Sequence, residues 1–237
     1  MELVSPEIGA VLERARQAQN QAMSTGRLKS GTYSEFHKEK ADREIEENVK
    51  RAGLGVRYRN CTFDAMNKRQ IPGSIRGEYL EVKKYADNLS ENIKNGTGLL
   101  LKGPVGTMKT SLAAAVLLHH IHQGGQGMFI SMSSLLDTIF SLKAKNVGEW
   151  AKFENNLRKT SILVIDDLGA EYTEGWVLTK VDAIISERYN NMLPIIVTTN
   201  LSANELKATY AERVIDRIRS TMLTVSFSGQ SLRSRAV

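Results

Sequence analysis

The hydrophobic pattern divides the chain into a sparsely apolar first part and a strongly apolar remainder. From about residue 56 onward, short apolar runs alternate with longer amphipathic stretches, which predicts strands alternating with helices. The short runs with strand character are Leu99–Leu101, Gly127–Ser131, Ser161–Ile165, Pro194–Thr199 and Leu223–Phe227. The longer stretches predict helices over Ile75–Ile93, Lys109–Gln123, Ser133–Lys143, Val147–Leu157, Trp176–Asn191 and Ser202–Arg219. This order is typical of an α/β fold with a parallel sheet flanked by helices.

The first 55 residues have a different pattern. Apolar residues at helical spacing predict a helix over Glu7–Met23, and the Gly-, Ser- and Thr-rich stretch Gly26–Tyr33 predicts a linker. Ser34–Ala52 is densely charged, and its thin apolar stripe consists of Phe36, Ala41, Ile45 and Val49. So sparse a stripe does not anchor a helix in a core, which leaves a plain surface helix or a helix that docks on a partner.

We therefore predict two parts: a mainly helical partner-docking segment and linker over residues 1–55, and a globular domain over 56–237. The globular part begins with Tyr58–Phe63, which we expect to be extended.

Composition narrows the class of protein. The formal net charge of +6 is compatible with a polyanionic partner without requiring one. The single cysteine, Cys61, excludes an internal disulfide, and the four histidines are too scattered for a zinc site. No apolar run approaches the ~18 residues of a membrane span, and no signal peptide is evident, so we expect a cytoplasmic protein.

The segment between the first strand and the next helix carries the clearest chemical motif. Residues 103–110 read Gly-Pro-Val-Gly-Thr-Met-Lys-Thr and match the phosphate-binding pattern G-x-x-x-x-G-K-[ST] at every fixed position but one. Backbone N–H groups of such a loop and the following helix N-terminus attract an anion. Lys109 would reach the β- and γ-phosphates of ATP, and the Thr110 hydroxyl would bind Mg²⁺. The expected nucleotide-binding residues are Gly103, Pro104, Val105, Gly106, Thr107, Met108, Lys109, Thr110 and Ser111.

Met108 is the exception, because it stands where the pattern has its last glycine. Glycine serves there either because φ is positive or because the loop must close on phosphate. If Met108 is helical and its side chain points away, ATP still binds; otherwise affinity or hydrolysis falls. The other interpretation of the loop is a strand-to-helix turn that binds nothing.

Acidic and polar side chains follow the next two core strands. Asp166 and Asp167 end the apolar run Ser161–Ile165, at the strand end where ligands gather in open α/β sheets. One carboxylate would hold Mg²⁺ and the other would orient or deprotonate the attacking water. Asn200 follows the Pro194–Thr199 strand, where it would contact the γ-phosphate or that water; alone, it would be a turn residue.

Arg213 and Arg217 are four residues apart and share one helical face. They form either a solvated basic face paired with Glu212 and Asp216, or arginines delivered to the γ-phosphate of a neighbouring subunit. The second interpretation requires an oligomer with the site at the subunit boundary.

Taken in order, these motifs resemble the DnaC/DnaI group of bacterial replicative helicase loaders, which are AAA+ ATPases related to IstB transposition proteins. The resemblance covers roughly residues 56–237. It is carried by Arg57–Phe63, Gly103–Thr110, Leu163–Gly169, Thr199–Asn200, Glu212–Arg217 and Ser231–Arg235.

The resemblance implies a role for each matching position. Lys109 and Thr110 fall on Walker A, Asp166 and Asp167 on Walker B, and Asn200 on sensor 1. Arg213 and Arg217 match the arginine-finger segment, and Arg233 matches the sensor 2 arginine. In this family single-stranded DNA is gripped near the helical pair before Walker B, which makes Lys143 and Lys145 the candidate phosphate contacts.

The resemblance thus implies an AAA+ domain that binds ATP and Mg²⁺, oligomerises with ATP, and docks a hexameric replicative helicase for placement on single-stranded DNA. Met108, and Asp167 in place of the more common Glu, suggest slow hydrolysis suited to a switch. Two alternatives stay open: an IstB-like transposition ATPase acting on DNA, and a hydrolysis-poor, nucleotide-dependent adaptor.

Overall fold

The computed structural model of this chain describes residues 30–145, 147–169 and 175–233, with side chains over 38–141, 148–169 and 178–233. Contacts divide the chain into two units, residues 1–46 and 47–237. Helix α2 (Ser30–Arg51) runs from the first unit into the second. Its start at Ser30 corrects the predicted linker over Gly26–Tyr33, since residues 30–33 are helical. The predicted helix over Glu7–Met23 lies outside the described residues.

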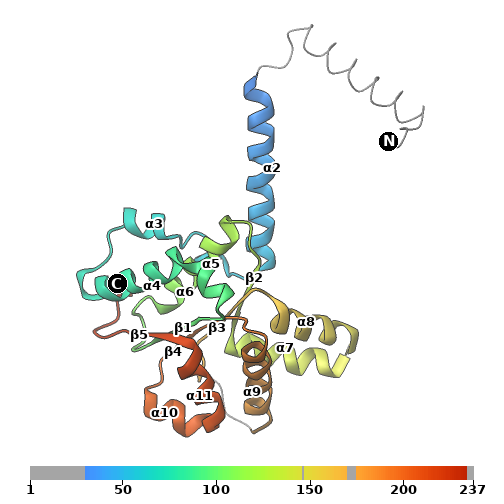
Figure 1. Ribbon diagram of the computed structural model, residues 1–237, viewed down its shortest axis with the longest axis vertical. Coiled ribbons are helices and arrows are strands. Elements are labelled where there is room, and N and C mark those ends of the chain that lie inside the picture. Colours follow the sequence, from blue (N-terminus) through green and yellow to red (C-terminus); the bar gives the residue numbers. More distant parts are fainter. Residues whose placement is uncertain (1–29, 146, 170–174, 234–237) are drawn as a thin grey trace, which may run out of the picture. The chain divides into compact units, whose positions relative to one another are not determined.

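The second unit is a five-stranded, all-parallel sheet flanked by helices (Figure 1). The strand order is β2-β3-β4-β1-β5. The strands are β1 (Gly98–Lys102), β2 (Gly127–Ser131), β3 (Ile162–Asp166), β4 (Ile195–Thr199) and β5 (Met222–Ser226). The α/β prediction is therefore confirmed, and each strand lies within one or two residues of its predicted bounds.

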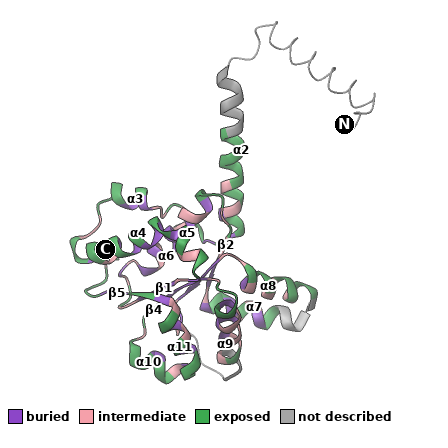
Figure 2. Ribbon diagram, in the orientation of Figure 1, coloured by how far each residue is buried: buried purple, intermediate pink, exposed green. Residues whose placement is uncertain are grey.

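Burial along the strands explains their order in the sheet. Every residue of β3 and β4 is buried, as their unbroken apolar runs require for strands covered on both faces. Edge strand β5 instead has only two buried residues, Met222 and Val225, and its other residues are exposed. Figure 2 shows the buried residues concentrated on the strands and on the helix faces turned toward them.

The helices that follow the strands cover the two faces of the sheet (Figure 1). Helix α6 (Lys109–His122) follows β1 and precedes β2 in the sequence, and its residues Leu112–Leu118 are fully buried. The other α-helices described after α2 are α3 (Phe63–Lys68), α4 (Arg76–Asp87), α5 (Leu89–Lys94), α7 (Met132–Lys145), α8 (Val147–Lys159), α9 (Gly175–Asn190), α10 (Ala203–Thr209) and α11 (Glu212–Thr221). Over the described residues, no helix is both long and apolar enough to cross a membrane.

Two local predictions are wrong for identifiable reasons. Tyr58–Phe63 is not extended: a 3₁₀ turn, η1 (Val56–Tyr58), leads to α3, whose start is capped by the Thr62 hydroxyl accepting from the Ala65 N–H at 3.1 Å. In place of the single helix predicted over Ile75–Ile93, the 3₁₀ turn η2 (Gly73–Ile75) leads into α4, and Asn88 separates α4 from α5. The Asn88 amide donates to the Lys84 carbonyl oxygen, which offers the backbone an alternative to continuing the helix.

Arg188 of α9 ties the starts of two strands together from inside the protein. Its side chain is fully buried, and its guanidinium donates to the carbonyl oxygens of Leu157 at 3.0 Å, Thr160 at 2.9 Å and Pro194 at 2.8 Å. Burial lowers the pKa of Arg188 to about 10, so the group is charged at neutral pH. One cation thereby supplies a charged hydrogen-bond donor to carbonyl oxygens that precede β3 and β4.

Candidate nucleotide site

The phosphate-binding pattern forms a loop between the end of β1 and the start of α6. Gly103 and Gly106 both have positive φ, at 143° and 85°. Each also packs against the C-terminal segment of the described chain: a Cβ on Gly103 would meet Phe227, and one on Gly106 would meet Ser231. These glycines therefore permit both the turn and a close approach by a second segment.

Met108 has a left-handed backbone conformation, which glycine adopts more readily than other residues. Its φ is 68° and its ψ is 10°, and it directly precedes α6. The helical alternative considered for this position is thus wrong, and the loop keeps its glycine-like backbone in spite of the side chain. Left-handed backbone costs a residue with a Cβ roughly 1–2 kcal/mol. The Met108 side chain therefore lowers the stability of the loop but does not change the backbone conformation of the loop.

Lys109 is buried and holds the loop from its centre. Its Nζ donates to the carbonyl oxygens of Gly103 and Pro104, each at 2.7 Å, and to Asn200 Oδ1 at 2.8 Å. Burial lowers the pKa of Lys109, and the charges of Asp167 and Asp166 act in the opposite direction. The ammonium is thus fixed between the loop and the end of β4, where it can meet a phosphate without a search through rotamers.

The two acids predicted at the end of β3 have different surroundings. Asp166 is buried, and its Oδ1 accepts from the Thr198 hydroxyl at 2.7 Å. Burial raises the pKa of Asp166 above its ordinary value, while the hydrogen bonds from Thr198 and Thr110 act against that rise. Asp167 has a left-handed backbone, with φ of 57°, and its N–H donates to Thr198 Oγ1 at 2.9 Å. That turn directs the two successive carboxylates into different environments.

Asn200 connects the loop to the acids. Its Oδ1 accepts from Lys109 Nζ, and its Nδ2 donates to Asp167 Oδ1 at 3.4 Å. One amide at the end of β4 thus contacts the buried ammonium of the loop and one of the two acids together. A residue in this position can register whether a phosphate has replaced it as the partner of Lys109.

Lys109, Asp167 and Asn200 line a cleft of about 850 Å³, whereas the buried Asp166 is not part of its lining. Its floor is the loop from Val105 to Ser111 with Asp167 and Asn200, one wall is formed within residues 57–72, and another by Leu232 and Arg233. Tyr58 of this wall stacks on Phe129 of β2, with ring centroids 6.1 Å apart. A cleft of this size accommodates a nucleotide.

The C-terminal segment lies directly on the phosphate loop. The Phe227 N–H donates to the Lys102 carbonyl oxygen at 2.7 Å, and the Leu232 N–H donates to the Gly106 carbonyl oxygen at 2.9 Å. Both bonds hold the segment beside the loop, so that Arg233 borders the cleft. A guanidinium at this edge can reach phosphate groups in the cleft.

The oxygen ligands available here fit a magnesium ion. Asp166 offers a carboxylate and Thr110 a hydroxyl, and the Thr110 hydroxyl acts to lower the pKa of Asp166. Mg²⁺ in nucleotide sites takes one or two protein oxygens and completes its shell with water and phosphate. The donor set is therefore appropriate without histidine or cysteine.

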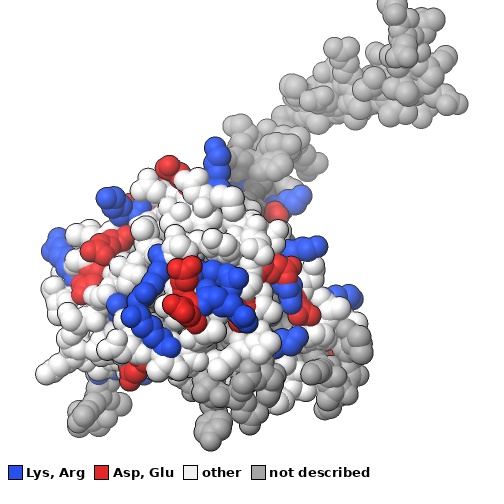
Figure 3. Space-filling view, turned by 60° about the horizontal axis from the view of Figure 1, so that its bottom comes forward, with Lys and Arg blue, Asp and Glu red and all other residues white. Residues whose placement is uncertain are grey.

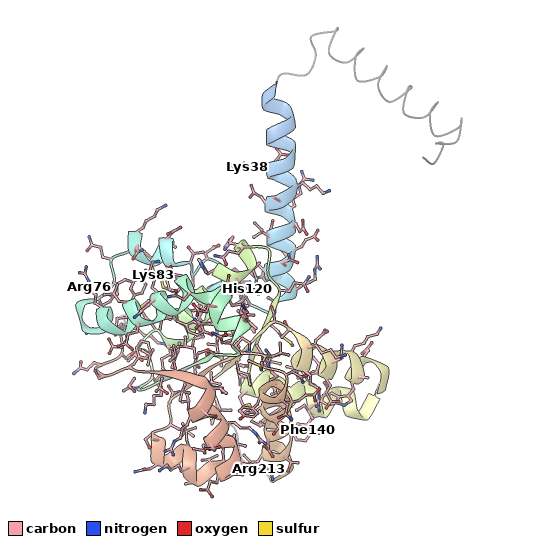
Figure 4. The ribbon with its side chains drawn as sticks, in the orientation of Figure 1. Lys38, Arg76, Lys83, His120, Phe140 and Arg213 are labelled. Atoms are coloured by element: carbon pink, nitrogen blue, oxygen red, sulfur yellow. The ribbon has the colours of Figure 1, made fainter. Side chains whose placement is uncertain are left out.

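Arg213 and Arg217 lie outside the cleft as the described residues define it. They do not pair with Glu212 and Asp216, as the solvated-face interpretation supposed; instead both bind Asp182 of α9. Arg213 Nε donates to Asp182 Oδ2 at 2.7 Å, and Arg217 Nη1 donates to Oδ1 at 3.2 Å. Figure 4 labels Arg213 on α11, near α9.

The candidate DNA contacts can be placed only in part. Lys143 and Lys145 are in the last turn of α7, and their side chains lie outside the described residues. The described part of α7 carries an exposed Phe140, labelled in Figure 4, and exposed hydroxyls such as Ser133 and Ser134. Sequence reasoning did not single out Phe140, although an aromatic residue between polar ones on an amphipathic helix was a readable signal.

Three contacts were not predicted from the sequence: Asp182 as the partner of Arg213, Thr198 as a hydrogen-bond donor to Asp166, and Tyr58 as part of the cleft wall. Thr198 carried a signal, because it immediately precedes the Thr199–Asn200 motif. Asp182 carried none, since its partners are 31 and 35 residues away.

The parallel sheet, the loop before α6 and the acid pair after β3 define a P-loop ATP-binding domain of the AAA+ class. A family model described as "IstB-like ATP binding protein" matches residues 6–237, so the chain belongs to that family. The replicative helicase loader DnaC of Escherichia coli (strain K12) is 24% identical over 192 residues, which are 81% of this chain and 76% of DnaC.

Solved structures agree with this assignment. A crystal structure of the DnaC helicase loader is 27% identical, covers 73% of this chain and 100% of its own, and has a TM-score of 0.65. The replication initiator DnaA bound to AMPPCP and single-stranded DNA shares the fold, with a TM-score of 0.61 and 19% identity over 75% of this chain and 51% of DnaA. The resemblance to the DnaC group and its IstB relatives is thereby confirmed.

Proposed function

We propose that this chain is an ATP-switched helicase loader: it docks on a hexameric replicative helicase and places it on single-stranded DNA. The observation that carries the proposal is the extent of the match to DnaC, whose crystallised chain is covered completely at 27% identity. The proposed arrangement is a docking segment over 1–55 and an AAA+ domain over 56–237, in the cytoplasm.

Each cleft residue has a proposed part in this reaction. Lys109, the backbone of residues 103–111 and Arg233 bind the phosphates of ATP. Thr110 and Asp166 would hold Mg²⁺, which neutralises phosphate charge when bound. Asp167 orients the attacking water and accepts its proton, and Asn200 fixes the Asp167 carboxylate through its Nδ2.

The switch follows from Asn200 and Lys109. Lys109 Nζ donates to two loop carbonyl oxygens and to Asn200 Oδ1. A γ-phosphate offers Lys109 a stronger, charge-assisted partner, which would release Asn200 toward the attacking water and the end of β4. A switch needs such a difference in interaction between the two nucleotide states, and tight binding alone does not provide it.

The DNA contact is proposed on α7. Lys143 and Lys145 supply cations for the backbone, while Phe140 offers a stacking surface beside hydroxyl donors. Contacts of these kinds bind single strands without sequence preference. We propose that ATP assembles several copies of the chain along the strand.

Co-purification tests the proposal. The chain is mixed with the replicative hexameric helicase of its host with ATP, with ADP or without nucleotide, and the complex is isolated by gel filtration. We expect a complex whose amount changes severalfold between ATP and ADP. Lys109→Ala, which removes the phosphate-binding cation, should bind the helicase without this nucleotide dependence. Absence of a helicase complex in every nucleotide state would contradict the proposal.

A second candidate is an IstB-like ATPase that assembles on duplex DNA and recruits a transposase, because the family model of that description matches residues 6–237. ATP-dependent binding to duplex DNA, together with capture of a transposase in place of the helicase, would favour it.

A further inference from the structure

One carboxylate of α9 binds two arginines of α11. Asp182 Oδ2 accepts from Arg213 Nε at 2.7 Å and also pairs with Arg213 Nη2, while Oδ1 accepts from Arg217 Nη1 at 3.2 Å and from the Ser186 hydroxyl at 3.1 Å. Arg217 also lies over the ring of Tyr189, 5.7 Å from its centroid. The two guanidinium groups are thereby held as one pair from a single anchor.

Exposure differs sharply across this cluster. The Asp182 side chain is 11% exposed and that of Arg217 24%, whereas that of Arg213 is 66% exposed. Burial alone would raise the pKa of Asp182, but the hydrogen bonds from Arg213 and Ser186 and the two arginine charges lower it below its ordinary value. The anchor is thus an ionised carboxylate at neutral pH, and it presents cations to the surface. In Figure 3, which brings the lower elements of Figure 1 forward, acidic and basic side chains lie side by side near the centre of the view.

Arg217 lies at the opposite end of the sheet from the phosphate loop of its own chain. Arg217 lines a cavity with Gly96, Ile195 and Met222, at the starts of β1, β4 and β5. The phosphate loop follows the end of β1, which is five residues long. At about 3.3 Å per residue, roughly 15 Å separates the two ends of that strand. Arg217 is therefore held away from the phosphate loop of its own chain.

We infer that Asp182 is a positioning residue that holds Arg213 and Arg217 together as a pair for the ATP phosphates of a second copy of this chain. This inference rests on the proposed ATP-dependent assembly. Free arginine side chains lose rotamer entropy when they are fixed. Asp182 fixes both side chains before assembly. It contacts only the Nε–Nη2 edge of Arg213, so the rest of that exposed guanidinium is left for a phosphate. Asp182 itself touches no nucleotide.

Steady-state ATPase and nucleotide binding of the full chain test the inference. For Asp182→Asn, we expect kcat under assembling conditions to fall about tenfold or more, since arginines supplied in trans act on the transition state. The Kd for AMPPCP measured on the dilute, unassembled chain should stay within about twofold, because the variant's own cleft is intact. Asp182→Glu should recover part of kcat. Asp87→Asn is the matched control, because Asp87 also pairs with a cation, Lys83 at 2.7 Å, on an exposed helix surface; its kcat should equal that of wild type.

Mixing experiments separate a role in trans from damage to the fold. Lys109→Ala has a defective phosphate site but an intact arginine pair, and Asp182→Asn has the reverse. A mixture of the two should hydrolyse ATP severalfold faster than the sum of the separate proteins. The double variant Arg213→Gln with Arg217→Gln, which leaves Asp182 in place, should show the same loss and the same rescue.

The outcomes distinguish this inference from the proposed function. Wild-type ATPase that is absent or independent of protein concentration would overturn both. Concentration-dependent wild-type ATPase, with Asp182→Asn as active as wild type, would overturn this inference alone. Failure of rescue in mixtures that do form mixed assemblies would do the same, because the lost activity would then lie in the variant's own cleft.

Discussion

At the scale of single residues, two methionines hold the same rare backbone conformation in different places. Met108 has φ of 68° in the phosphate loop, and Met192 has φ of 52° after α9. Both carry the cost of a Cβ in left-handed backbone. Their comparison separates the effect of this strain on stability from any effect on nucleotide chemistry.

We expect Met108→Gly to raise the free energy of unfolding by about 0.5–1 kcal/mol, since relief of left-handed strain exceeds the added entropy of glycine in the unfolded chain. AMPPCP affinity should change by less than about threefold, because the loop already has the glycine-like backbone. Urea denaturation and equilibrium binding measure the two effects.

Met192→Gly is the matched control. It relieves the same conformation far from the loop, so it should stabilise to a similar degree and leave nucleotide binding and ATPase unchanged. A gain of tenfold or more in ATPase by Met108→Gly alone would show that the side chain impairs the site beyond its backbone cost.

A site residue could be predicted from the sequence where its position relative to a strand end is fixed. Lys109, Asp166 and Asn200 were found because each sits at a fixed offset from a strand end, and strand ends are readable from apolar runs. The Asp182 pairing was not readable, because it depends on how α9 and α11 pack. The conformation of Met108 was likewise left between two alternatives, since the pattern itself does not state which property of glycine the loop uses.

At the scale of elements, Arg188 connects three segments. It donates to the carbonyl oxygens of Leu157 near the end of α8, Thr160 shortly before β3 and Pro194 directly before β4. Its Nε is buried without a hydrogen-bond partner among the described residues.

We expect Arg188→Met to cost about 3–5 kcal/mol in the free energy of unfolding, because several buried carbonyls lose their donor together. Arg188→Lys should recover little, since an ammonium lacks the planar fork that reaches both strands. Thermal and urea denaturation report the loss. Arg219→Met, at an exposed position near the end of α11, should stay within about 0.5 kcal/mol of wild type.

The tie between α9 and α11 should weaken in acid. The pKa of Asp182 is lower in the folded chain than its ordinary value, so its stabilisation is present at neutral pH and is lost as pH falls through the folded pKa. The free energy of unfolding of wild type should exceed that of Asp182→Asn by up to about 1 kcal/mol at pH 7. The value is small because solvent screens this partly exposed cluster.

That difference should shrink below about pH 4. Melting temperatures of both proteins between pH 7 and pH 3.5 provide the measurement. A difference that stays constant over this range would show that the carboxylate charge is not what joins the two helices.

The elements themselves were largely predictable. All five strands were found. Strands β1 to β4 each contain at least three consecutive apolar residues, and apolar and polar residues alternate over the β5 region. The errors concern capping: Thr62 starts α3 and Asn88 separates α4 from α5 by single side-chain hydrogen bonds that hydrophobic periodicity does not register. Strand order was not predicted, because it depends on which strands pair across the sheet.

At the scale of the whole molecule, the division after Glu46 makes a clear prediction. The buried residues Val49, Ala52 and Leu54 belong to the second unit, and the Phe129 N–H donates to the Ala52 carbonyl oxygen at 2.7 Å. A fragment comprising residues 47–237 should therefore melt within about 2 °C of the full chain and bind AMPPCP within about twofold.

The same fragment should lose the helicase complex if the first unit is the docking segment. A longer fragment, 30–237, which restores the whole of α2, tests whether that helix suffices. Retention of the complex by residues 47–237 would place the docking surface on the AAA+ domain itself.

The bonds from Phe227 to Lys102 and from Leu232 to Gly106 have a practical consequence for anyone who labels this protein. A purification tag, fluorophore or surface tether fused at Val237 is attached only four residues beyond Arg233, and its drag or bulk falls on a segment bonded to the phosphate loop. Kinetics recorded with such a fusion would report the label as well as the enzyme. Labels for single-molecule work are better attached at an exposed helical residue such as Ser90 of α5, through a cysteine introduced after Cys61 has been replaced.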